Sequence, residues 1–427
     1  MANAKPDNSY RRNHYVPAWY QDRFLSAEAR ERKYYYLDLR PDVVECADGI
    51  GRPRKAIRHL GPDSCFYVDD LYTTKLGSRF STEIEQQFFG PIDRIGNKAL
   101  DFIEKFDLQH LDRDIFNRFV EIMSLQRLRT PRGLAWLEAT NKIRDRNATL
   151  IHLQSVWQMH CAIWSEAVWC ILEATNSETK FIVSDNPVTY YNEGCFPEGQ
   201  FVRAWGDPDI RMRGTHTIYP ISPEKALVLT HLSWARNPYG RPERLHPNPN
   251  FFRTGIWKAT DVQFGRQLCD SEVARINYII KTRADRFIAS QNPEWLFPER
   301  QLENTHWRKL SDSHFLMPDP RLMTFSDSVV FGFDDGRPGQ VYDEYGRRPW
   351  QRPADAKKRR DAEWRSFSRF QGEYARLNGP SPNGNVHKMG MKSSSELCEA
   401  LHESYLEREE YYAPKLGGRK KRRSKRG

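Results

Sequence analysis

The sequence of 427 residues lacks the features that mark several large protein classes. It has no run of about eighteen apolar residues, so we expect no transmembrane helix and no membrane partner. No apolar signal region stands at the N-terminus, and the seven cysteines form no CxxC pair. We therefore expect a cytoplasmic protein without a disulfide framework or a zinc ribbon. A GxxxxGKS/T loop, an HExxH helix and a GxSxG elbow are also missing, which argues against P-loop, zincin and α/β-hydrolase chemistry.

The composition is that of a folded, well-solvated protein with a basic end. Hydrophobic residues make up 39% and aromatic residues 13% of the chain, enough for a sizeable core. The last thirteen residues hold eight basic side chains and no acidic one, and removing those eight charges from the total of +10 leaves +2. The run Arg419-Lys420-Lys421-Arg422-Arg423 would attract a polyanion by counterion release, so we expect nucleic acid as its partner. The alternative is a solvated basic terminus that aids solubility or contacts ribosomal RNA nonspecifically.

Changes in composition predict four segments. We expect a disordered N-terminus at 1–12, a core domain at 13–292, a C-terminal extension at 293–414 and a disordered basic tail at 415–427. Within the extension, helices are predicted near 355–378 and 394–411.

The patterning of the core predicts an α+β fold. Strands are expected near 34–39 and 180–184, with a hairpin formed by 215–220 and 226–230. Helices are expected from about 81, at 112–129, over a long stretch at 133–173 and at 271–290. Since strands stand at both ends of a helical run, we expect a small, largely antiparallel sheet packed on a helical middle section.

Two short motifs carry the most specific information. Residues 13–17 read Asn-His-Tyr-Val-Pro, and residues 184–188 read Ser-Asp-Asn-Pro-Val. The second motif directly follows the apolar run 181–183, a predicted buried strand. Open sheets tend to present functional groups just beyond the ends of such strands.

The two motifs resemble the signatures of an uncharacterised, mostly bacterial family, known only as a domain of unknown function. That family has HYVP near its N-terminus and SDNPV in its middle. Residues 125–131 (Leu-Gln-Arg-Leu-Arg-Thr-Pro) and the turn 220–223 (Pro-Ile-Ser-Pro) agree with its further segments, in the same order. The resemblance covers about 13–290 and implies a family without implying a reaction. Ala18 departs from it, since the family commonly has Gln after HYVP.

The motifs and their neighbours supply the candidate site residues. His14, Asp185, Asn186 and Glu83 are candidate catalytic groups, because imidazole and carboxylate side chains transfer protons. Asp185 and His14 are also candidate ligands for a divalent cation such as Mg²⁺ or Mn²⁺. For each group a structural role is the alternative: Asp and Asn make turns before proline, and a histidine can pack among aromatic rings.

Three further residues are candidates for substrate binding: Gln126, Arg129 and Arg132. The two arginines flank Pro131, and each could bind a phosphate through two parallel hydrogen bonds. The alternative is a capping or surface role.

Two hypotheses of function follow from these residues. In the first, the candidate residues share one cleft and form a metal-dependent phosphodiesterase or nuclease-like enzyme that acts on nucleic acid. In the second, both motifs are structural, and the protein is a non-catalytic module that binds nucleic acid or another protein. The distances between His14, Asp185 and Arg129 distinguish the two.

Overall fold

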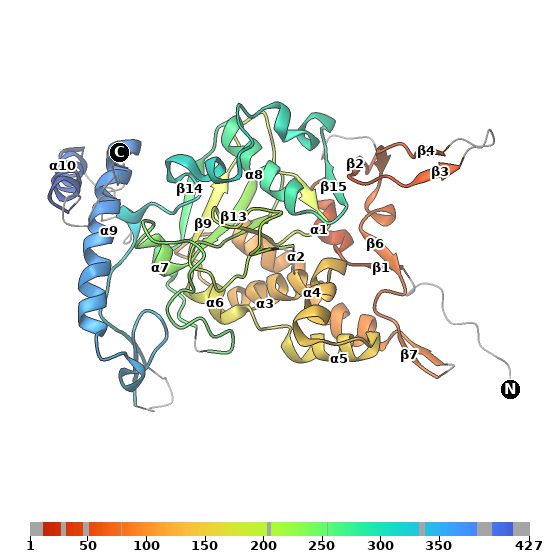
Figure 1. Cartoon of the computed structure of the whole chain (residues 1–427), viewed down its shortest axis with the longest axis horizontal. Coiled ribbons are helices and arrows are strands. Elements are labelled where there is room, and N and C mark those ends of the chain that lie inside the picture. Colours follow the sequence, from red (N-terminus) through yellow and green to blue (C-terminus); the bar gives the residue numbers. More distant parts are fainter. Residues whose placement is uncertain are drawn as a thin grey trace, which may run out of the picture.

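The computed structural model describes eight stretches of the chain: 12–26, 31–45, 51–77, 79–202, 206–253, 255–332, 338–381 and 395–412. The predicted basic run at 419–423 lies outside the described residues, as do residues 1–11. N-terminal hairpins stand at one end of the long axis, and the C-terminal helices stand at the other (Figure 1).

The centre of the molecule is a five-stranded sheet. Its strands lie in the order β11 (Thr189–Tyr191), β12 (His216–Pro220), β13 (Lys225–Thr230), β9 (Val168–Glu173) and β14 (Gln263–Gln267). All neighbours are antiparallel except β14, which runs parallel to β9. The predicted hairpin of β12 and β13 is confirmed. Its turn is the Pro-Ile-Ser-Pro segment, where the Ile221 N–H donates to the carbonyl oxygen of Lys225 at 2.7 Å.

Both faces of this sheet are buried, because apolar residues occupy successive positions along its strands. Trp169 and Ile171 of β9 face the helices α2 (Gly90–Glu104) and α3 (Arg113–Arg129). Cys170 and Leu172 of the same strand face α8 (Asp270–Arg283) on the other side. The sheet therefore forms the middle of three layers, with α2 and α3 below it and α8 above it in Figure 1.

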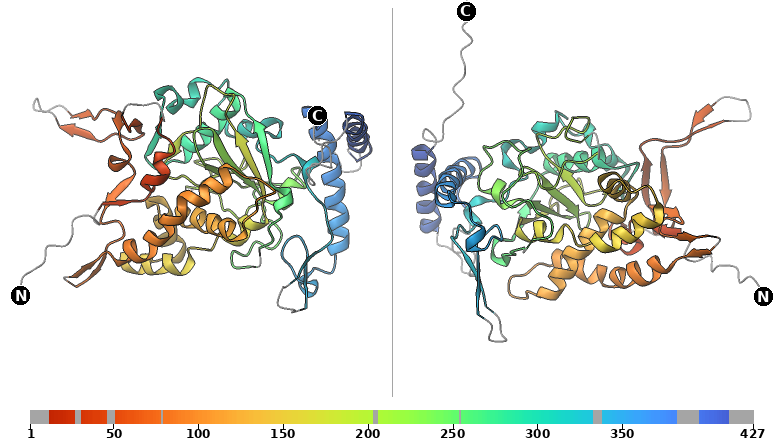
Figure 2. Two further views of the ribbon diagram at one scale, coloured as in Figure 1. Left: turned by 180° about the vertical axis from the view of Figure 1, so that it is seen from behind. Right: turned by 60° about the horizontal axis from the view of Figure 1, so that its bottom comes forward.

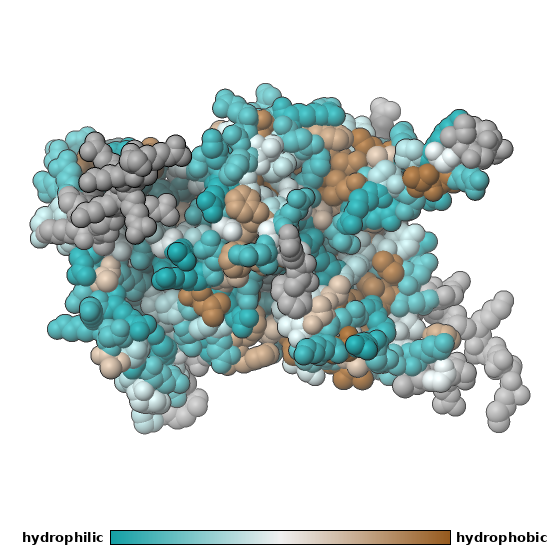
Figure 3. Space-filling view, in the orientation of Figure 1, coloured by the Kyte–Doolittle hydropathy of each residue, from teal (hydrophilic) through white to brown (hydrophobic). Residues whose placement is uncertain are grey.

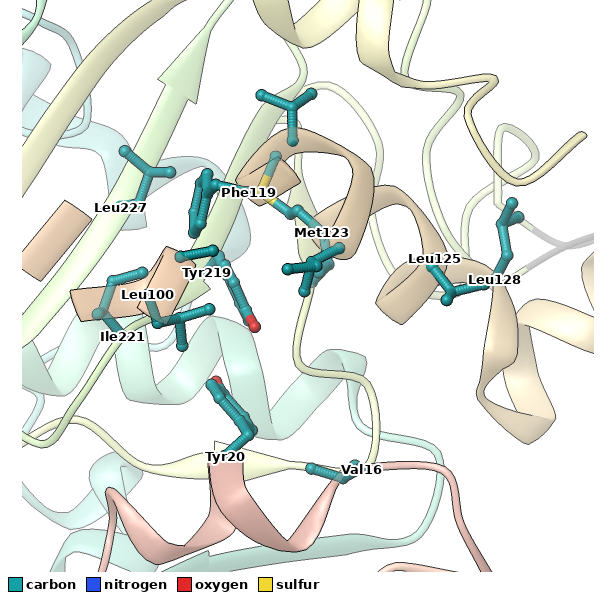
Figure 4. Close-up of a cluster of buried hydrophobic side chains, with 14 of the residues drawn as sticks. Val16, Tyr20, Leu100, Phe119, Met123, Leu125, Leu128, Tyr219, Ile221 and Leu227 are labelled. Carbon is teal, nitrogen blue, oxygen red and sulfur yellow. The ribbon is translucent and has the colours of Figure 1, made fainter. Parts of the chain in front are cut away.

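The lower core joins the N-terminus to the sheet. Tyr20, on α1 (Ala18–Asp22), stacks on Tyr219 of β12 with ring centroids 5.4 Å apart (Figure 4). The Tyr20 hydroxyl donates to the carbonyl oxygen of Pro220 at 2.6 Å. Phe119 of α3 packs beside the same Tyr219 ring, so the HYVP end of the chain, the middle helix and the sheet share one core.

A second sheet brings together distant segments of the chain. It is antiparallel throughout, in the order β10 (Val183–Ser184), β15 (Phe287–Ser290), β2 (Tyr34–Asp38) and β5 (Ile57–Leu60). Three smaller pairs complete the N-terminal part: β1 (Arg12–His14) with β6 (Tyr67–Asp69), β3 (Val43–Glu45) with β4 (Gly51–Pro53), and β7 (Thr74–Leu76) with β8 (Arg79–Ser81). The last two hairpins project from the body (Figure 2).

The remaining helices of the core are shorter than predicted. The stretch expected to be helical over 133–173 divides into α4 (Pro131–Asn141), α5 (Arg146–Val156) and α6 (Cys161–Glu166). Its last part was predicted wrongly: 168–173 is β9, because it pairs with strands from elsewhere in the chain. For the same reason the helix expected at 271–290 ends at Arg283, and β15 follows it.

The C-terminal extension packs on the core. Trp307 and Leu310, in the turn η7 (Trp307–His314), belong to the same buried cluster as α8. The hairpin of β16 (Val329–Phe331) and β17 (Gln340–Tyr342) leads to α9 (Ala356–Asn378) and α10 (Ser395–Tyr412). Both predicted helices are thus confirmed. Phe367 of α9 packs with Leu232, which anchors α9 on the core.

The α+β prediction is confirmed, and the sheets are small and mostly antiparallel. Within the described stretches no helix is long and apolar enough to cross a bilayer. The face in Figure 3 is mostly hydrophilic, with scattered apolar patches.

Candidate functional site

Side chains of helix α3 donate hydrogen bonds to the main chain of the HYVP segment. The Gln126 side-chain amide donates to the carbonyl oxygen of Tyr15 at 2.8 Å, and Arg129 Nη2 donates to the carbonyl oxygen of His14 at 3.2 Å. Arg129 Nη1 also pairs with Asp93 at 2.8 Å, and both α3 side chains are buried. The two residues predicted to bind substrate therefore bind the protein's own backbone and one internal carboxylate.

The other two N-terminal candidates lie apart from this contact. The His14 ring packs near Tyr67, with centroids 5.8 Å apart, and burial lowers the pKa of His14. Glu83 is exposed at the start of the π-helical turn η3 (Ile84–Phe89), where its backbone N–H donates to Ser81 Oγ at 3.3 Å. Among the described residues, no hydrogen bond or ion pair joins His14 or Glu83 to Asp185.

Asp185 ties β10 to the start of β15. Its carboxylate accepts three backbone hydrogen bonds, from the N–H groups of Asp285 (2.7 Å), Arg286 (2.6 Å) and Phe287 (2.7 Å). The side chain is buried, and burial raises the pKa of Asp185 to about 6, against the opposing effect of the three N–H donors. Its oxygens are thus occupied by main-chain donors, as in a structural brace.

Asn186, the next residue of the SDNPV motif, connects this segment to α3 and α8. Its Oδ1 accepts a hydrogen bond from Arg127 Nη1 at 2.7 Å, and its Nδ2 donates to the carbonyl oxygen of Arg283 at 3.1 Å. Arg127 lies on α3 between Gln126 and Arg129. Successive helical residues differ by about 100° in direction, so Arg127 reaches SDNPV while its neighbours reach HYVP.

Behind Asn186 lies what we call the buried arginine cluster: Arg127, Arg132, Arg283 and Asp207. Asp207 accepts from Arg127 Nη2 at 2.6 Å and from Arg132 Nε at 2.9 Å. Burial, together with the neighbouring guanidinium groups, lowers the pKa of Arg283 to about 10 despite the attraction of Asp207. Arg132 therefore binds an internal anion, where the sequence predicted a phosphate.

Three members of this cluster were not predicted from the sequence: Arg127, Asp207 and Arg283. Arg127 was part of a recognised segment, but its neighbour Gln126 was singled out instead. Asp207 and Arg283 carry no local pattern, since one lies in an irregular loop and the other ends α8. Only their shared contact with Arg127 and Asn186 identifies them.

The described residues offer no prepared metal site. Among them, no group of three or more His, Cys, Asp or Glu side chains lies close enough to hold a metal ion. His14 and Asp185, the two predicted ligands for Mg²⁺ or Mn²⁺, do not share a site. The His14 ring packs near Tyr67, and Asp185 accepts hydrogen bonds from three backbone N–H groups. The geometry thus favours the structural alternative for both motifs.

A larger concave surface lies where the core meets the extension. Two adjoining cavities of about 710 and 570 Å³ share Asn248 and Arg347, and we call them together the junction groove. One side comes from 213–253 of the core and the other from 325–363 of the extension.

Basic side chains outnumber acidic ones in the lining of the junction groove. Ten basic and four acidic side chains line it: Arg213, Arg236, Arg244, Arg253, Arg347, Arg348, Arg352, Lys357, Arg359 and Arg360, against Asp327, Asp343, Glu344 and Glu363. Carboxylates pair with five of these arginines: Glu344 and Glu363 with Arg236, Asp343 with Arg347, Asp327 with Arg360, Glu166 with Arg253, and Asp355 with Arg359. Arg352 has no carboxylate within ion-pair distance among the described residues, and its buried Nε and Nη2 have no hydrogen-bond acceptor there.

Aromatic side chains accompany these cations. Arg348 lies over the rings of Tyr342 and Trp350, at 4.7 and 4.8 Å from their centroids. Trp350 is 73% exposed, and Phe252, which lines the second cavity, is 65% exposed. Large aromatic faces therefore stand open to solvent beside guanidinium groups.

Comparison with known proteins gives a family and no activity. The family model described as "Protein of unknown function (DUF4238)" matches residues 12–294. The match ends close to the predicted core boundary at 292, so the extension half of the junction groove lies outside it. Neither the curated proteins nor the solved structures gave a match.

Proposed function

The chain belongs to the DUF4238 family of proteins of unknown function, and we propose from its geometry that it is a non-catalytic nucleic-acid-binding protein whose binding surface is the junction groove. The observation that carries the proposal is the lining of this groove, where basic side chains outnumber acidic ones. The exposed ring of Phe252 belongs to the lining, and the exposed ring of Trp350 lies against Arg348, which lines the groove. HYVP and SDNPV serve as internal braces in this proposal.

Binding is favoured over hydrolysis by the contacts of the candidate catalytic residues. Asp185 is saturated by three backbone N–H groups, and Arg129 is paired with Asp93. A phosphodiesterase needs a group that is free to activate water and a group that stabilises the leaving oxygen. Five of the predicted residues are committed to internal contacts: Gln126, Arg129, Arg132, Asp185 and Asn186. Within the described part of the chain neither His14 nor Glu83 is joined to Asp185 by a hydrogen bond or ion pair, so we do not extend the proposal to metal-dependent cleavage.

Single-stranded nucleic acid suits the groove best. Proteins that bind single strands combine a positive track for phosphates with aromatic faces on which bases stack. Arg352 and Lys357 would contact phosphates, and Trp350 would stack on a base. The basic run at 419–423 would add a sequence-independent contribution. A reducing cytoplasm fits this proposal, because the cysteines among the described residues are free thiols.

The test is fluorescence anisotropy of a labelled single strand of about twenty nucleotides, titrated at several salt concentrations. Replacing Arg352 by alanine should reduce the slope of log K against log[salt] by about 0.7, because one phosphate contact is lost. Trp350→Ala should weaken binding by about 1–3 kcal/mol with little change in that slope, because stacking is not ionic. Arg94→Ala, an exposed arginine on α2 away from the groove, is the matched control.

The same measurements on a chain lacking 415–427 separate the tail from the groove. We expect the deletion to flatten the salt dependence while the Trp350 effect persists. Binding that disappears entirely with the tail, or that responds equally to Arg352→Ala and Arg94→Ala, would contradict the groove as the binding surface.

A further inference from the structure

A third cavity, of about 360 Å³, lies beside the buried arginine cluster, and we call it the motif pocket. All its lining residues lie between Arg127 and Phe252, inside the segment that matches the family. It is therefore separate from the extension half of the junction groove. Its volume is within the range of small-molecule sites.

Aromatic rings form part of the wall of the motif pocket, and its charged lining residues stand in two ion pairs, Arg127 with Asp207 and Arg211 with Asp209. Trp136 and Phe251 both pack near His160, with ring centroids 6.2 and 5.7 Å from the imidazole. Burial is the main cause that lowers the pKa of His160 to about 3, and the positive charge of Arg127 adds to it. The imidazole is therefore neutral at physiological pH. Tyr190 adds another aromatic surface. Such walls suit a flat, uncharged ring, which can stack or pack edge-on.

The polar part of the lining has unused hydrogen-bonding capacity. Asp207 Oδ1 and the Tyr190 hydroxyl are buried and have no hydrogen-bond partner among the described residues. Burial alone would raise the pKa of Asp207, but the adjacent Arg132 and Arg127 outweigh it and hold the carboxylate ionised. A buried acceptor without a donor is destabilising, so a ligand N–H that reached it would be favoured.

We propose that the motif pocket binds a planar heteroaromatic ring that carries an amino group, of the size of a nucleobase. The ring packs against Trp136 and Phe251, and the amino group donates toward Asp207. A cationic ligand is disfavoured, because Arg132 and Arg283 lie behind that carboxylate. This site does not depend on the proposed binding of nucleic acid in the junction groove.

The test is isothermal titration calorimetry of the full chain with free bases, which carry no phosphate. Adenine and cytosine are the aminated probes, and purine, which lacks the amino group, is the matched control. We expect adenine to bind at least ten-fold more tightly than purine. Tyr190→Phe, which removes one hydroxyl, and Trp136→Ala should each weaken adenine binding at least five-fold.

Two further variants keep the test decisive. Thr140 is exposed at the rim of the motif pocket, so Thr140→Arg should block adenine without entering the core. Arg94→Ala, on α2 and outside the lining of both sites, should leave adenine binding unchanged. Thermal melts confirm that each variant is folded. The proposal is overturned if neither aminated base saturates the protein at millimolar concentration, if purine binds as well as adenine, or if the folded Thr140→Arg variant binds adenine normally.

Discussion

Replacing Asp185 by asparagine tests whether SDNPV is a brace. The carboxylate accepts three backbone N–H groups at 2.6–2.7 Å, and only 3% of the residue is exposed. An amide offers one oxygen and places an NH₂ group against N–H donors, so at least one buried N–H loses its acceptor. Each such loss costs about 1–3 kcal/mol, and we expect the variant to be about 2–4 kcal/mol less stable at pH 7.5.

The difference in stability between the wild type and Asp185→Asn should change with pH in one direction. Burial raises the pKa of Asp185 to about 6 in the folded protein, from an ordinary value of 3.8. The folded state therefore holds this proton more tightly than the unfolded state, and the wild type gains stability from Asp185 as the pH falls through 6 toward 3.8. Asparagine does not titrate. The gap between wild type and variant should widen at low pH, by up to about 3 kcal/mol.

Urea unfolding followed by tryptophan fluorescence, at pH 7.5 and pH 5, measures both effects. Asp107→Asn is the matched control, because Asp107 is 48% exposed and accepts one backbone N–H, from Gln109 at 2.9 Å. Its other contact is a surface ion pair with the exposed His110, which contributes little to stability. Asparagine can keep that bond, so the control should change stability by about 0.5 kcal/mol or less. If the Asp185 variant is as stable as this control, Asp185 is not a brace. A stable variant that no longer bound nucleic acid would restore Asp185 as a functional residue.

Two further substitutions test the packing around the motifs by the same unfolding assay. Asp207→Asn should cost about 3–5 kcal/mol, because it leaves buried arginines without their counterion. The control is Asp209→Asn, which removes a half-exposed ion pair with Arg211 and should cost less than about 1 kcal/mol. If both substitutions lowered the stability equally, the internal role of Asp207 would be contradicted. Gly96→Ala should cost about 1–3 kcal/mol, since its Cβ would lie 2.2 Å from the ring of Trp19. Gly90→Ala has its nearest contact at 3.5 Å and should be neutral, so a neutral Gly96→Ala would mean that α1 and α2 pack less closely than described.

The sequence by itself determined the elements whose signals are local. Turn residues between two apolar runs placed the hairpin of β12 and β13, and regular apolar spacing placed α9 within a residue or two. The two motifs identified the family across most of the core. Local patterns sufficed there because caps, turns and amphipathic spacing act within a few residues of the chain.

Tertiary structure decided what depends on distant partners. Residues 168–173 follow helices and continue their apolar spacing, yet they form a strand because β13 and β14 supply hydrogen-bonding edges on both sides. Asp185 looked like a catalytic acid because its donors lie one hundred residues further along the chain. The junction groove and the motif pocket likewise unite residues from separate elements. Burial and hydrogen-bond partners are set by the whole fold, so chemistry that depends on a free or a saturated side chain cannot be assigned from local sequence alone.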